Sequence, residues 1–176
     1  MNTIRYCKVR EVKSPCRAHP EDAGIDFFIP ENLTAMVMSE QNQIIGSEPG
    51  MTFTDNGYVA SIVLDPGQSV LIPSGIKVKV PAGYMLQYTN KSGVASKKHL
   101  LVGANVIDIG YEGECHINLH NVGQSSVTIN AGDKICQGIL VQVGFHQPEE
   151  VKDEAELFGT ESSARGEGGF GSSGTK

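Results

Sequence analysis

Three short stretches and a glycine-rich tail contain the residue types that phosphate chemistry requires. The first stretch, NKSGVASKK at 90–98, brings together Lys91, Ser92 and Gly93. A lysine, a hydroxyl and a flexible glycine backbone can together hold phosphate oxygens. The stretch is not a P-loop, because the pattern G-x-x-x-x-G-K-[ST] is absent from the chain. Taken alone, it is better explained by an ordinary polar loop than by a phosphate site.

The second stretch, GANVIDIGYEGE at 103–114, places Asp108 between apolar neighbours. A carboxylate in such a run is costly to bury unless it is hydrogen-bonded or has a chemical task. The sequence IGYEG within it is typical of a tight hairpin with Tyr111 at its tip. An aspartate that caps the turn and an aspartate that acts as a catalytic base explain this stretch equally well.

The third stretch, GDKICQGIL at 132–140, is typical of a turn followed by a strand. Gln137 interrupts the apolar residues of that strand and is therefore placed to face a ligand. Taken alone, the stretch favours an ordinary strand residue whose amide is satisfied by hydrogen bonds.

The tail, RGEGGFGSSGTK from residue 165 onward, combines parts that suit a nucleotide lid. Arg165 supplies a planar guanidinium for phosphate, and the glycines let backbone N–H groups approach an anion. Phe170 offers a face on which a base can stack, while Ser172 and Ser173 add hydroxyl donors. Because no apolar period is found from residue 159 onward, we expect the tail to be mobile when no nucleotide is bound.

The elements that must position these residues are expected to be short strands. The chain has 176 residues, 21 of them glycine, which suits one domain with many turns. Between residues 59 and 89, the tripeptides DPG, PSG and PAG separate short runs of β-branched and aromatic residues. Strands are expected at residues 4–12, 25–30, 59–64, 69–73, 76–80, 84–89, 105–109, 115–121, 126–130 and 134–143. This spacing with glycine turns predicts an all-β sandwich, jelly roll or barrel.

Two segments depart from the strand pattern. Residues 32–58 contain apolar pieces without a sustained period, and GSEPG within them suggests an extra hairpin. Residues 148–158 have a helical pattern, with Val151, Ala155 and Phe158 roughly on one face.

Composition and charge exclude several classes of function. A net charge of −6 without a basic face argues against binding of duplex nucleic acid, although it leaves nucleotide binding open. No apolar run approaches the length of a membrane span, so we expect no membrane contact. The four cysteines lack C-x-x-C spacing and the first residues lack the apolar core of a signal peptide. We therefore expect reduced cysteines and a cytoplasmic protein, or one of the host cytoplasm if the source is viral.

Taken in order, five stretches resemble the motifs of the trimeric dUTPases, the dUTP pyrophosphatases. The matches are EDAGIDFFIP at Ala23, Gly24 and Asp26, NKSGVASKK, GANVIDIGYEGE at Asp108 and Tyr111, GDKICQGIL at Gly132, Asp133 and Gln137, and RGEGGFGSSG. LDPGQSVLIPSGIKVKVPAGY, between the first two motifs, also resembles the family scaffold. The resemblance covers most of the chain, and five ordered motifs at compatible spacing are far more specific than any one of them.

The resemblance implies a β-barrel or jelly-roll-like subunit in a homotrimer with three sites between subunits. It implies hydrolysis of dUTP to dUMP and pyrophosphate, with Mg²⁺ bound mainly by the triphosphate. Asp108 then corresponds to the general base that directs water at the α-phosphorus. Tyr111 corresponds to the residue that lies under the deoxyribose and leaves no room for a 2′-hydroxyl. Asp26 corresponds to a residue that contacts the metal through water.

The same resemblance assigns the substrate-binding residues. The backbone of Asn105, Val106 and Ile107 would read the edge of uracil, and Phe170 would close over the base. The residues implied for the phosphates and the lid are Lys91, Ser92, Gly93, Gln137, Arg165, Gly171, Ser172 and Ser173. We expect residues 1–158 to form the β-barrel domain and residues 159–176 to form the flexible lid.

Three features depart from the family pattern. Lys91 stands where arginine is usual, which exchanges a bidentate guanidinium for a point charge and concerns phosphate binding rather than the reaction type. Asn105 replaces a frequent glycine in the base-reading turn. Residues 32–58 exceed the usual connection by roughly two dozen residues. A loop tolerates such an insertion, which makes residues 32–58 a candidate surface for a protein partner.

Three alternatives compete with this assignment. A dCTP deaminase shares the expected fold and third motif, but that family places a catalytic glutamate where this chain has Asn118, and it usually lacks the glycine-rich lid. A regulatory protein could bind a partner through residues 32–58, although the retained motif residues argue against loss of activity. A trimeric β-shell without chemistry would not explain the lid.

Overall fold

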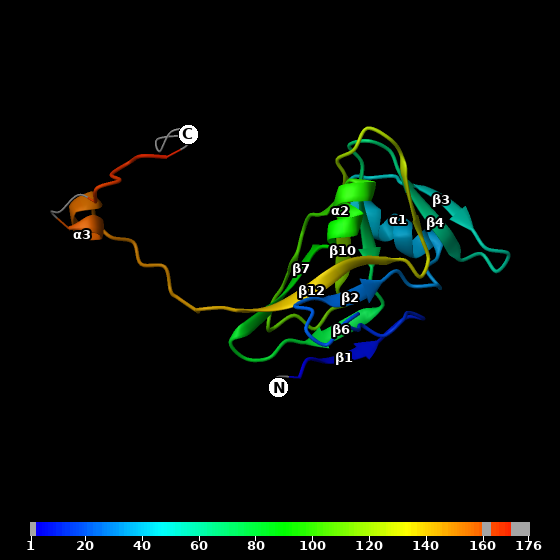
Figure 1. Ribbon diagram of the computed structural model, residues 1–176, viewed down its shortest axis with the longest axis horizontal. Helices are drawn as coiled ribbons and strands as arrows, with labels where there is room; N and C mark the ends of the chain where they lie inside the picture. Colours follow the sequence, from blue (N-terminus) through cyan, green and yellow to red (C-terminus); the bar gives the residue numbers. More distant parts are fainter. Residues whose placement is uncertain (1–2, 160–162, 170–176) are drawn as a thin grey trace. The chain divides into compact units, whose positions relative to one another are not determined.

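Residues 3–159 and 163–169 are described by the computed structural model drawn in Figure 1. The chain divides into two compact units, residues 1–144 and residues 145–176. The first unit holds the twelve strands of the described residues together with helices α1 (Ala35–Ile44) and α2 (Ser92–Lys98). The second unit holds helix α3 (Glu154–Phe158).

The strands of the first unit are short, and many are joined by tight turns. Their bounds are β1 Arg5–Lys8, β2 Ile25–Phe28, β3 Gly50–Phe53, β4 Val59–Leu64, β5 Ser69–Pro73, β6 Ile76–Lys79, β7 Tyr84–Asn90, β8 Leu100–Val102, β9 Val106–Ile107, β10 His116–Asn121, β11 Val127–Asn130 and β12 Lys134–Gln142. Each predicted strand is therefore confirmed, although β1 and β9 are shorter than expected and β3 and β8 were not foreseen.

The strands pair antiparallel in four sheets among the described residues. The strand orders are β1-β6, β5-β10-β8, β11-β4-β3 and β2-β12-β7-β9. In Figure 1, strands β2, β12 and β7 lie side by side, as their pairing requires. An all-β, jelly-roll-like fold is thus confirmed.

The predicted glycine turns position the central strands. Gly67, Gly75 and Gly83 have φ values of 79°, 73° and 80°, in the left-handed region that glycine adopts without a steric penalty. Between two of these turns, β6 alternates buried and exposed residues, as its sequence IKVK predicts. Local turn chemistry therefore determines where these strands begin and end.

One hydrophobic core joins the sheets of the first unit. Its largest fully buried side chains are Tyr88, Phe27, Ile29, Leu33, Met38, Ile62, Leu64, Ile72, Ile76, Leu86, Leu100 and Ile117. Phe27 of β2 and Tyr88 of β7 pack edge to face, with ring centroids 4.8 Å apart. These two strands therefore present one face to the core and keep the other available for polar side chains.

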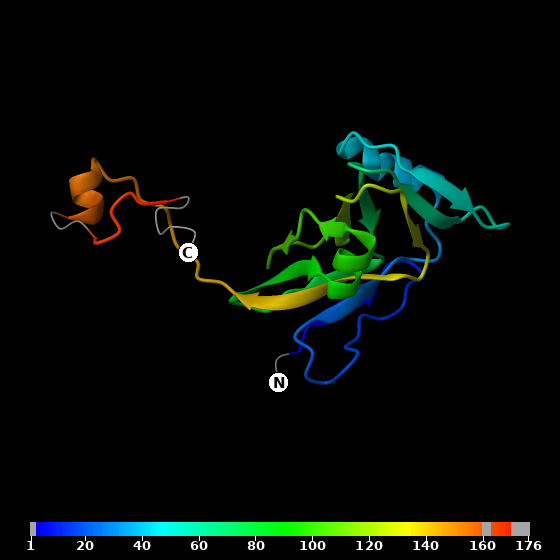
Figure 2. The ribbon, with the colours of Figure 1, turned by 45° about the horizontal axis from the view of Figure 1, so that its top comes forward.

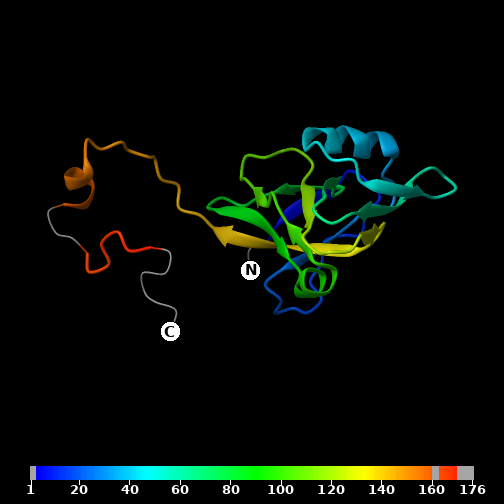
Figure 3. The same ribbon diagram turned by 90° about the horizontal axis from the view of Figure 1, so that it is seen from above.

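Residues 32–58 form a helix and a strand, and the hairpin expected at GSEPG is wrong. Helix α1 begins after Thr34, whose hydroxyl accepts a hydrogen bond from the N–H of Val37. Leu33 and Met38, at the positions of a hydrophobic staple, are both fully buried. The hairpin of this segment instead joins β3 to β4. Figure 2 and Figure 3 show α1 and this hairpin together at one end of the strands.

The helix predicted in the second unit is present but shorter than expected. Helix α3 covers five residues, and Asp153 caps it by accepting a hydrogen bond from the N–H of Glu156 at 3.0 Å. Among the described residues of both units, no helix is long and apolar enough to cross a membrane. All four cysteines are free.

Replacing Asn42 with alanine is expected to lower the free energy of unfolding by about 2–3 kcal/mol. Asn42 is buried, and its amide donates to the carbonyls of Met38 at 2.8 Å and Leu71 at 3.1 Å. Its side-chain oxygen accepts from the N–H of Leu71 at 3.0 Å, so the substitution removes the polar link between α1 and β5. Urea unfolding followed by circular dichroism measures the loss.

The neighbouring Gln43→Ala variant is the matched control for that measurement. Gln43 lies on the same helix but is exposed, so its removal is expected to change the free energy of unfolding by less than about 0.5 kcal/mol. Equal losses in the two variants would show that the buried amide of Asn42 does not hold α1 in place.

Candidate active site

The sheet β2-β12-β7-β9 positions most of the predicted site residues. Across β2 and β12, Phe27 is paired with Cys136, and Asp26 with Gln137. Phe27 and Cys136 belong to the hydrophobic core. Because successive side chains of a strand point to opposite faces, Asp26 and Gln137 lie on the face away from the core.

A first group of predicted residues lines a hollow beside β9. The hollow has a volume of about 180 Å³ and is lined by Leu71, Tyr88, Ala104, Asn105, Val106, Ile107, Asp108, Tyr111, Cys115 and His116. Ile107 is buried and paired with Leu86 of β7, whereas Asp108, directly after the strand, is exposed. The carboxylate is therefore accessible to a ligand and to water, and its charge is not enclosed among its apolar neighbours.

A hydrogen-bonded turn holds Asp108 in place. The carbonyl of Asp108 accepts from the N–H of Tyr111 at 3.1 Å, and the Tyr111 hydroxyl donates to the carbonyl of Glu114 at 2.9 Å. The Glu114 carboxylate accepts from the Arg10 guanidinium at 2.8 and 3.0 Å and from the N–H of Gly75 at 2.7 Å. The tight turn is confirmed, but it does not close a hairpin, because β9 pairs with β7 and β10 pairs with β5 and β8.

The side chains around the hollow favour an uncharged ligand. Burial lowers the pKa of His116, which keeps the imidazole neutral at pH 7. Burial raises the pKa of Cys115 to about 11, and it also raises the pKa of Tyr111. Neutral walls beside an exposed carboxylate suit the base and sugar of a nucleotide. No pattern in the sequence indicated His116, which stands in its strand like any other residue.

Asn118 supports the wall of this hollow. It is buried, its amide donates to the carbonyl of Val70 at 3.1 Å, and its side-chain oxygen accepts from the N–H of Ala104 at 3.0 Å. The same oxygen lies 3.0 Å from Nε2 of His120. Asn118 thus fixes the turn that leads into Asn105, a structural task at the position where a deaminase would need its glutamate.

A second group of residues surrounds the carboxylate of Asp26. Lys91 Nζ binds one oxygen of this carboxylate, and Lys134 Nζ lies 2.9 Å from the other. Burial acts to raise the pKa of Asp26, but hydrogen bonds and charges from Lys91 and Lys134 outweigh it and lower the pKa. The hydrogen bond to Asp26 in turn raises the pKa of Lys134. Asp26, which the sequence assigns to a metal contact, thus lies between two ammonium groups.

A bulge in β12 brings Lys134 to this group. Cys136 is paired with Phe27, yet Lys134 is paired with Phe28, so one extra residue is inserted between them. Without the bulge, Lys134 would share the face of Cys136, which is the core face opposite to that of Asp26. One inserted residue moves a side chain to the other face of the sheet. The bulge therefore re-aims Lys134 toward the carboxylate. No motif in the sequence indicated this, and Lys134 was not predicted.

Gln137 belongs to the same face and is closely enclosed. Its amide nitrogen donates to the carbonyl of Asn90 at 2.8 Å. A Cβ atom at Gly24 would lie 2.0 Å from the side-chain oxygen of Gln137, so this glycine is required for the amide to occupy its position. The amide is satisfied, as expected for a strand residue, and it also lies next to the lysine–aspartate group through its pairing with Asp26.

The stretch expected to be a polar loop is a short helix. Lys91 has an extended backbone and precedes α2, and its carbonyl accepts the N–H of Ala95 at 2.9 Å. Ser92 and Gly93 open the helix and are exposed. They directly follow β7, which places them beside Lys91 at the same end of that strand.

Within one chain, the two groups lie at opposite ends of β7. Ile107, the neighbour of Asp108, is level with Leu86 on this strand. Lys91 follows Leu86 by five residues, which at ~3.4 Å per residue corresponds to roughly 17 Å along the sheet. Asp108 and Lys91 of one chain are therefore too far apart to contact neighbouring phosphates of one nucleotide.

The tail residues are only partly described. In the second unit, Arg165 lies in a turn over residues 164–167, and its Nε donates to the carbonyl of Gly168 at 2.7 Å. The arginine is exposed. The other predicted lid residues, Phe170, Gly171, Ser172 and Ser173, lie outside the described residues.

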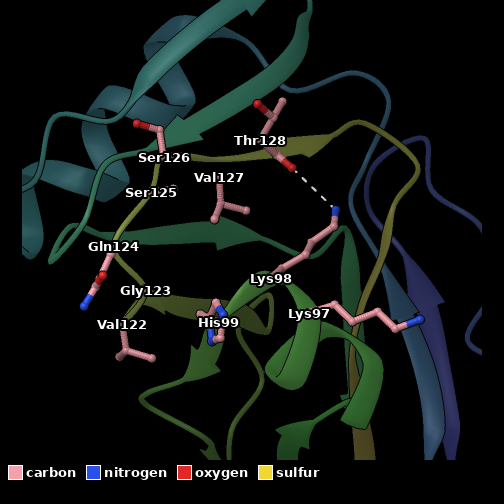
Figure 4. Close-up of a pocket in the computed structure, with 10 residues that line it drawn as sticks. All are labelled: Lys97, Lys98, His99, Val122, Gly123, Gln124, Ser125, Ser126, Val127 and Thr128. Atoms are coloured by element: carbon pink, nitrogen blue, oxygen red, sulfur yellow. Dashed lines mark hydrogen bonds between the residues drawn. The ribbon is translucent and has the colours of Figure 1, made fainter.

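A larger hollow of about 710 Å³ adjoins the end of α2 and contains none of the predicted site residues. Figure 4 shows Lys98 reaching toward Thr128, while Lys97 points away from it. Lys98 Nζ lies 3.5 Å from the carbonyl of Thr128 and 3.5 Å from a carboxylate oxygen of Asp133. These contacts attach the end of α2 to neighbouring turns and strands, so Lys98 has a structural task.

Such a scaffold, with a neutral hollow beside a carboxylate and a separate cationic group, is suited to hydrolysing a nucleoside triphosphate. Comparison with known proteins identifies the family. The sequence model of the dUTPase family matches residues 58–174. The chain is 38% identical over 115 residues to the deoxyuridine 5'-triphosphate nucleotidohydrolase of Chlamydia trachomatis serovar L2, covering 64% of this chain and 76% of that protein.

Two further similarities extend over nearly the whole chain. The deoxyuridine 5'-triphosphate nucleotidohydrolase of Mycobacterium sp. (strain JLS) is 33% identical over 170 residues, 94% of this chain and 90% of that protein. The solved dUTPase of Staphylococcus bacteriophage 80alpha with dUpNHpp is 26% identical, covers 99% of both chains and has a TM-score of 0.72. The chain therefore belongs to the dUTPase family. It is a dUTP diphosphatase, which hydrolyses dUTP to dUMP and pyrophosphate.

Replacing Gly24 with alanine is expected to lower kcat/KM for dUTP by at least about tenfold. The new methyl group would displace the amide of Gln137 from its bond to Asn90. Steady-state release of pyrophosphate measures this effect. In the control variant Gly50→Ala, the added Cβ meets Val63 at an ordinary 3.5 Å, and activity is expected to be retained. Full activity of Gly24→Ala would mean that the position of Gln137 does not matter to the reaction.

Proposed function

We propose that Asp108 activates the water molecule that attacks the α-phosphorus of dUTP. The observation that carries this proposal is an exposed carboxylate at the edge of a neutral hollow. With the base and sugar in the hollow, the α-phosphorus lies beside Asp108. A carboxylate that orients water and accepts its proton contributes both positioning and general-base catalysis. The water oxygen bonds to the α-phosphorus as the bond to the bridging oxygen breaks and pyrophosphate leaves.

We also propose that the edge of β9 reads the base. This strand is the last in the order β2-β12-β7-β9, so one row of its backbone N–H and C=O groups is not used by the sheet. Val106 is exposed on this strand, next to Asn105 and Ile107. These backbone groups can hydrogen-bond the edge of uracil, while Tyr111 lies beneath the deoxyribose and excludes a 2′-hydroxyl.

The phosphates and Mg²⁺ belong to the group around Asp26. We assign phosphate binding to Lys91, Ser92, Gly93 and Gln137. Among the described residues, no group of three or more His, Cys, Asp or Glu side chains could hold an ion. In keeping with the family resemblance, we propose that Mg²⁺ is carried mainly by the triphosphate. When bound, it supplies charge neutralisation at the phosphates. The Asp26 carboxylate accepts two lysine bonds and still has lone pairs for a metal-bound water, which fits a contact through water.

We propose a homotrimer with sites shared between subunits, and the separation of the two groups within one chain supports it. Asp108 and Lys91 of one chain are roughly 17 Å apart along β7, so we place them in two different active sites. A second chain that places its Asp26 group against the hollow of the first would complete one site. We propose that the tail, through Arg165, Phe170, Gly171, Ser172 and Ser173, then closes over that site as a lid that excludes water.

Residues 32–58 are the proposed surface for a protein partner. Met36, Ile44 and Phe53 expose large apolar side chains there, and the family match begins only at residue 58. The dUTPase of phage 80alpha is described among phage dUTPases that control transfer of virulence genes, which provides a precedent for a role beyond catalysis. The free, exposed thiols of Cys7 and Cys16 suit a cytoplasmic location, of the host if the source is viral.

The variant Asp108→Asn is expected to reduce turnover of dUTP by about three orders of magnitude while nucleotide binding persists. An amide still fits the position but cannot accept the proton from water. Pyrophosphate release from dUTP, dCTP, dTTP and UTP, with and without Mg²⁺, measures activity and selectivity. Calorimetric titration with dUpNHpp measures binding.

Asp55→Asn is the control for this substitution. Asp55 is an exposed residue of the β3–β4 turn, and its change is expected to leave turnover intact. Near-normal turnover in Asp108→Asn would remove Asp108 from the role of base. Ammonia release from dCTP at a rate matching pyrophosphate release from dUTP would contradict the assigned reaction.

Mixing two inactive variants is expected to restore activity if sites are shared between chains. One parent carries Asp108→Asn, and the other carries Lys91→Met together with Gln137→Leu. After joint unfolding and refolding in equal amounts, about a quarter of the sites in random trimers would combine the intact groups of two chains. Recovery near that fraction is the expected result. If every site belongs to one chain, the mixture stays as inactive as its parents.

A further inference from the structure

We propose that Lys134 is a second phosphate-binding cation of the active site and acts as a pair with Lys91. This inference rests on the proposed phosphate group around Asp26 and adds a residue to it. The pair would bind the β- and γ-phosphates of dUTP, or the two phosphates of the pyrophosphate product.

The bulge in β12 places Lys134 beside Asp26. The bulge between Lys134 and Cys136 turns this side chain to the face of the sheet that carries Asp26 and Gln137. Lys91 reaches the same carboxylate from the end of β7. Residues from β2, β12 and the end of β7 therefore meet at the Asp26 carboxylate. In a regular ladder, Lys134 would lie on the opposite face of the sheet.

The exposed fractions of the three side chains show which charged groups are accessible to a ligand. The Asp26 side chain is 5% exposed, whereas those of Lys91 and Lys134 are 23% and 41% exposed. The carboxylate is thus mostly covered, and the ammonium groups form most of the surface that a ligand meets. An ammonium group donates three hydrogen bonds, so each lysine can keep Asp26 and still donate to a phosphate.

The balance of charge also favours an anionic ligand. One carboxylate is ion-paired with two ammonium groups, so these three side chains carry one positive charge in excess, and Asp22 acts on Lys134 only through its more distant charge. The pair of Lys98 and Asp133 is different, because one lysine faces one carboxylate at 3.5 Å and no excess charge remains. In a chain with a net charge of −6, a local excess of positive charge next to Ser92 and Gln137 is suited to a polyphosphate.

The test is Lys134→Met, with inorganic pyrophosphate and Mg²⁺ as the probe. The dissociation constant of pyrophosphate is expected to rise about tenfold or more, because one charge-assisted hydrogen bond is lost. The KM for dUTP is expected to rise similarly. The affinity should also fall less steeply with salt concentration than in the natural protein, since one fewer cation contacts the ligand. Lys134→Arg, which keeps the charge, is expected to restore most of the affinity.

Lys98→Met is the matched control, because it also removes a lysine paired with an aspartate but lies outside the phosphate group. It is expected to leave the affinity for pyrophosphate and its salt dependence unchanged. Thermal unfolding of each variant separates a loss of folded protein from a loss of binding. Unchanged affinity and salt dependence in folded Lys134→Met would overturn the proposal. Failure of the natural protein to release pyrophosphate from dUTP would instead contradict the function itself, so the two failures are distinguishable.

Discussion

Strand β7 and its two registers determine the layout of the candidate active site. On one side, β7 pairs with β12 along its full length, from Tyr84 to Asn90. On the other side, near its beginning, it pairs with the two residues of β9. The first pairing sets Gln137 and the lysine–aspartate group at one end, and the second sets Asp108 at the other. Because hydrogen-bonded ladders fix these positions, neither group can move toward the other without breaking the sheet.

The two carboxylates of the site illustrate how environment separates their roles. Asp26 is buried, and such a charge is stable only because two lysines compensate for the lost water. Asp108 is exposed and keeps its access to water. A carboxylate committed to two ammonium groups is poorly placed to take a proton, whereas an exposed one can do so. These environments are consistent with the proposed base role of Asp108, and they suit Asp26 to holding its two lysines in place.

The sequence predicted the strands well because residues close by in the chain determine where each strand ends. Proline and glycine tripeptides end the strands between residues 59 and 89, and these signals need no tertiary information. Helix α1 was missed because its stability depends on Asn42 bonding to Leu71, a contact between distant residues. The helical form of residues 92–98 was missed because Ser and Gly in its first turn are typical of loops.

The candidate site could be predicted from the sequence where its residues lie in motifs. It could not be predicted where residues are placed by the register of paired strands. Asp108, Tyr111 and Gln137 stand in recognisable stretches, and the structure brings the first two into one hollow. Lys134 depends on a bulge of one residue, which a sequence does not reveal. His116 lines the hollow from β10, which belongs to a different sheet from β9. Residues that reach a site through pairing of distant strands leave no local pattern.

The shortness of β9 serves two purposes that would otherwise conflict. An open edge strand exposes unpaired backbone groups and invites association with other chains. Here the edge is only two residues long and is followed at once by the turn from Asp108 to Tyr111. A partner strand finds too few backbone groups to form a stable ladder, yet a pyrimidine needs only a few of them. The same truncated edge therefore limits aggregation and leaves free the groups from which a base can be recognised.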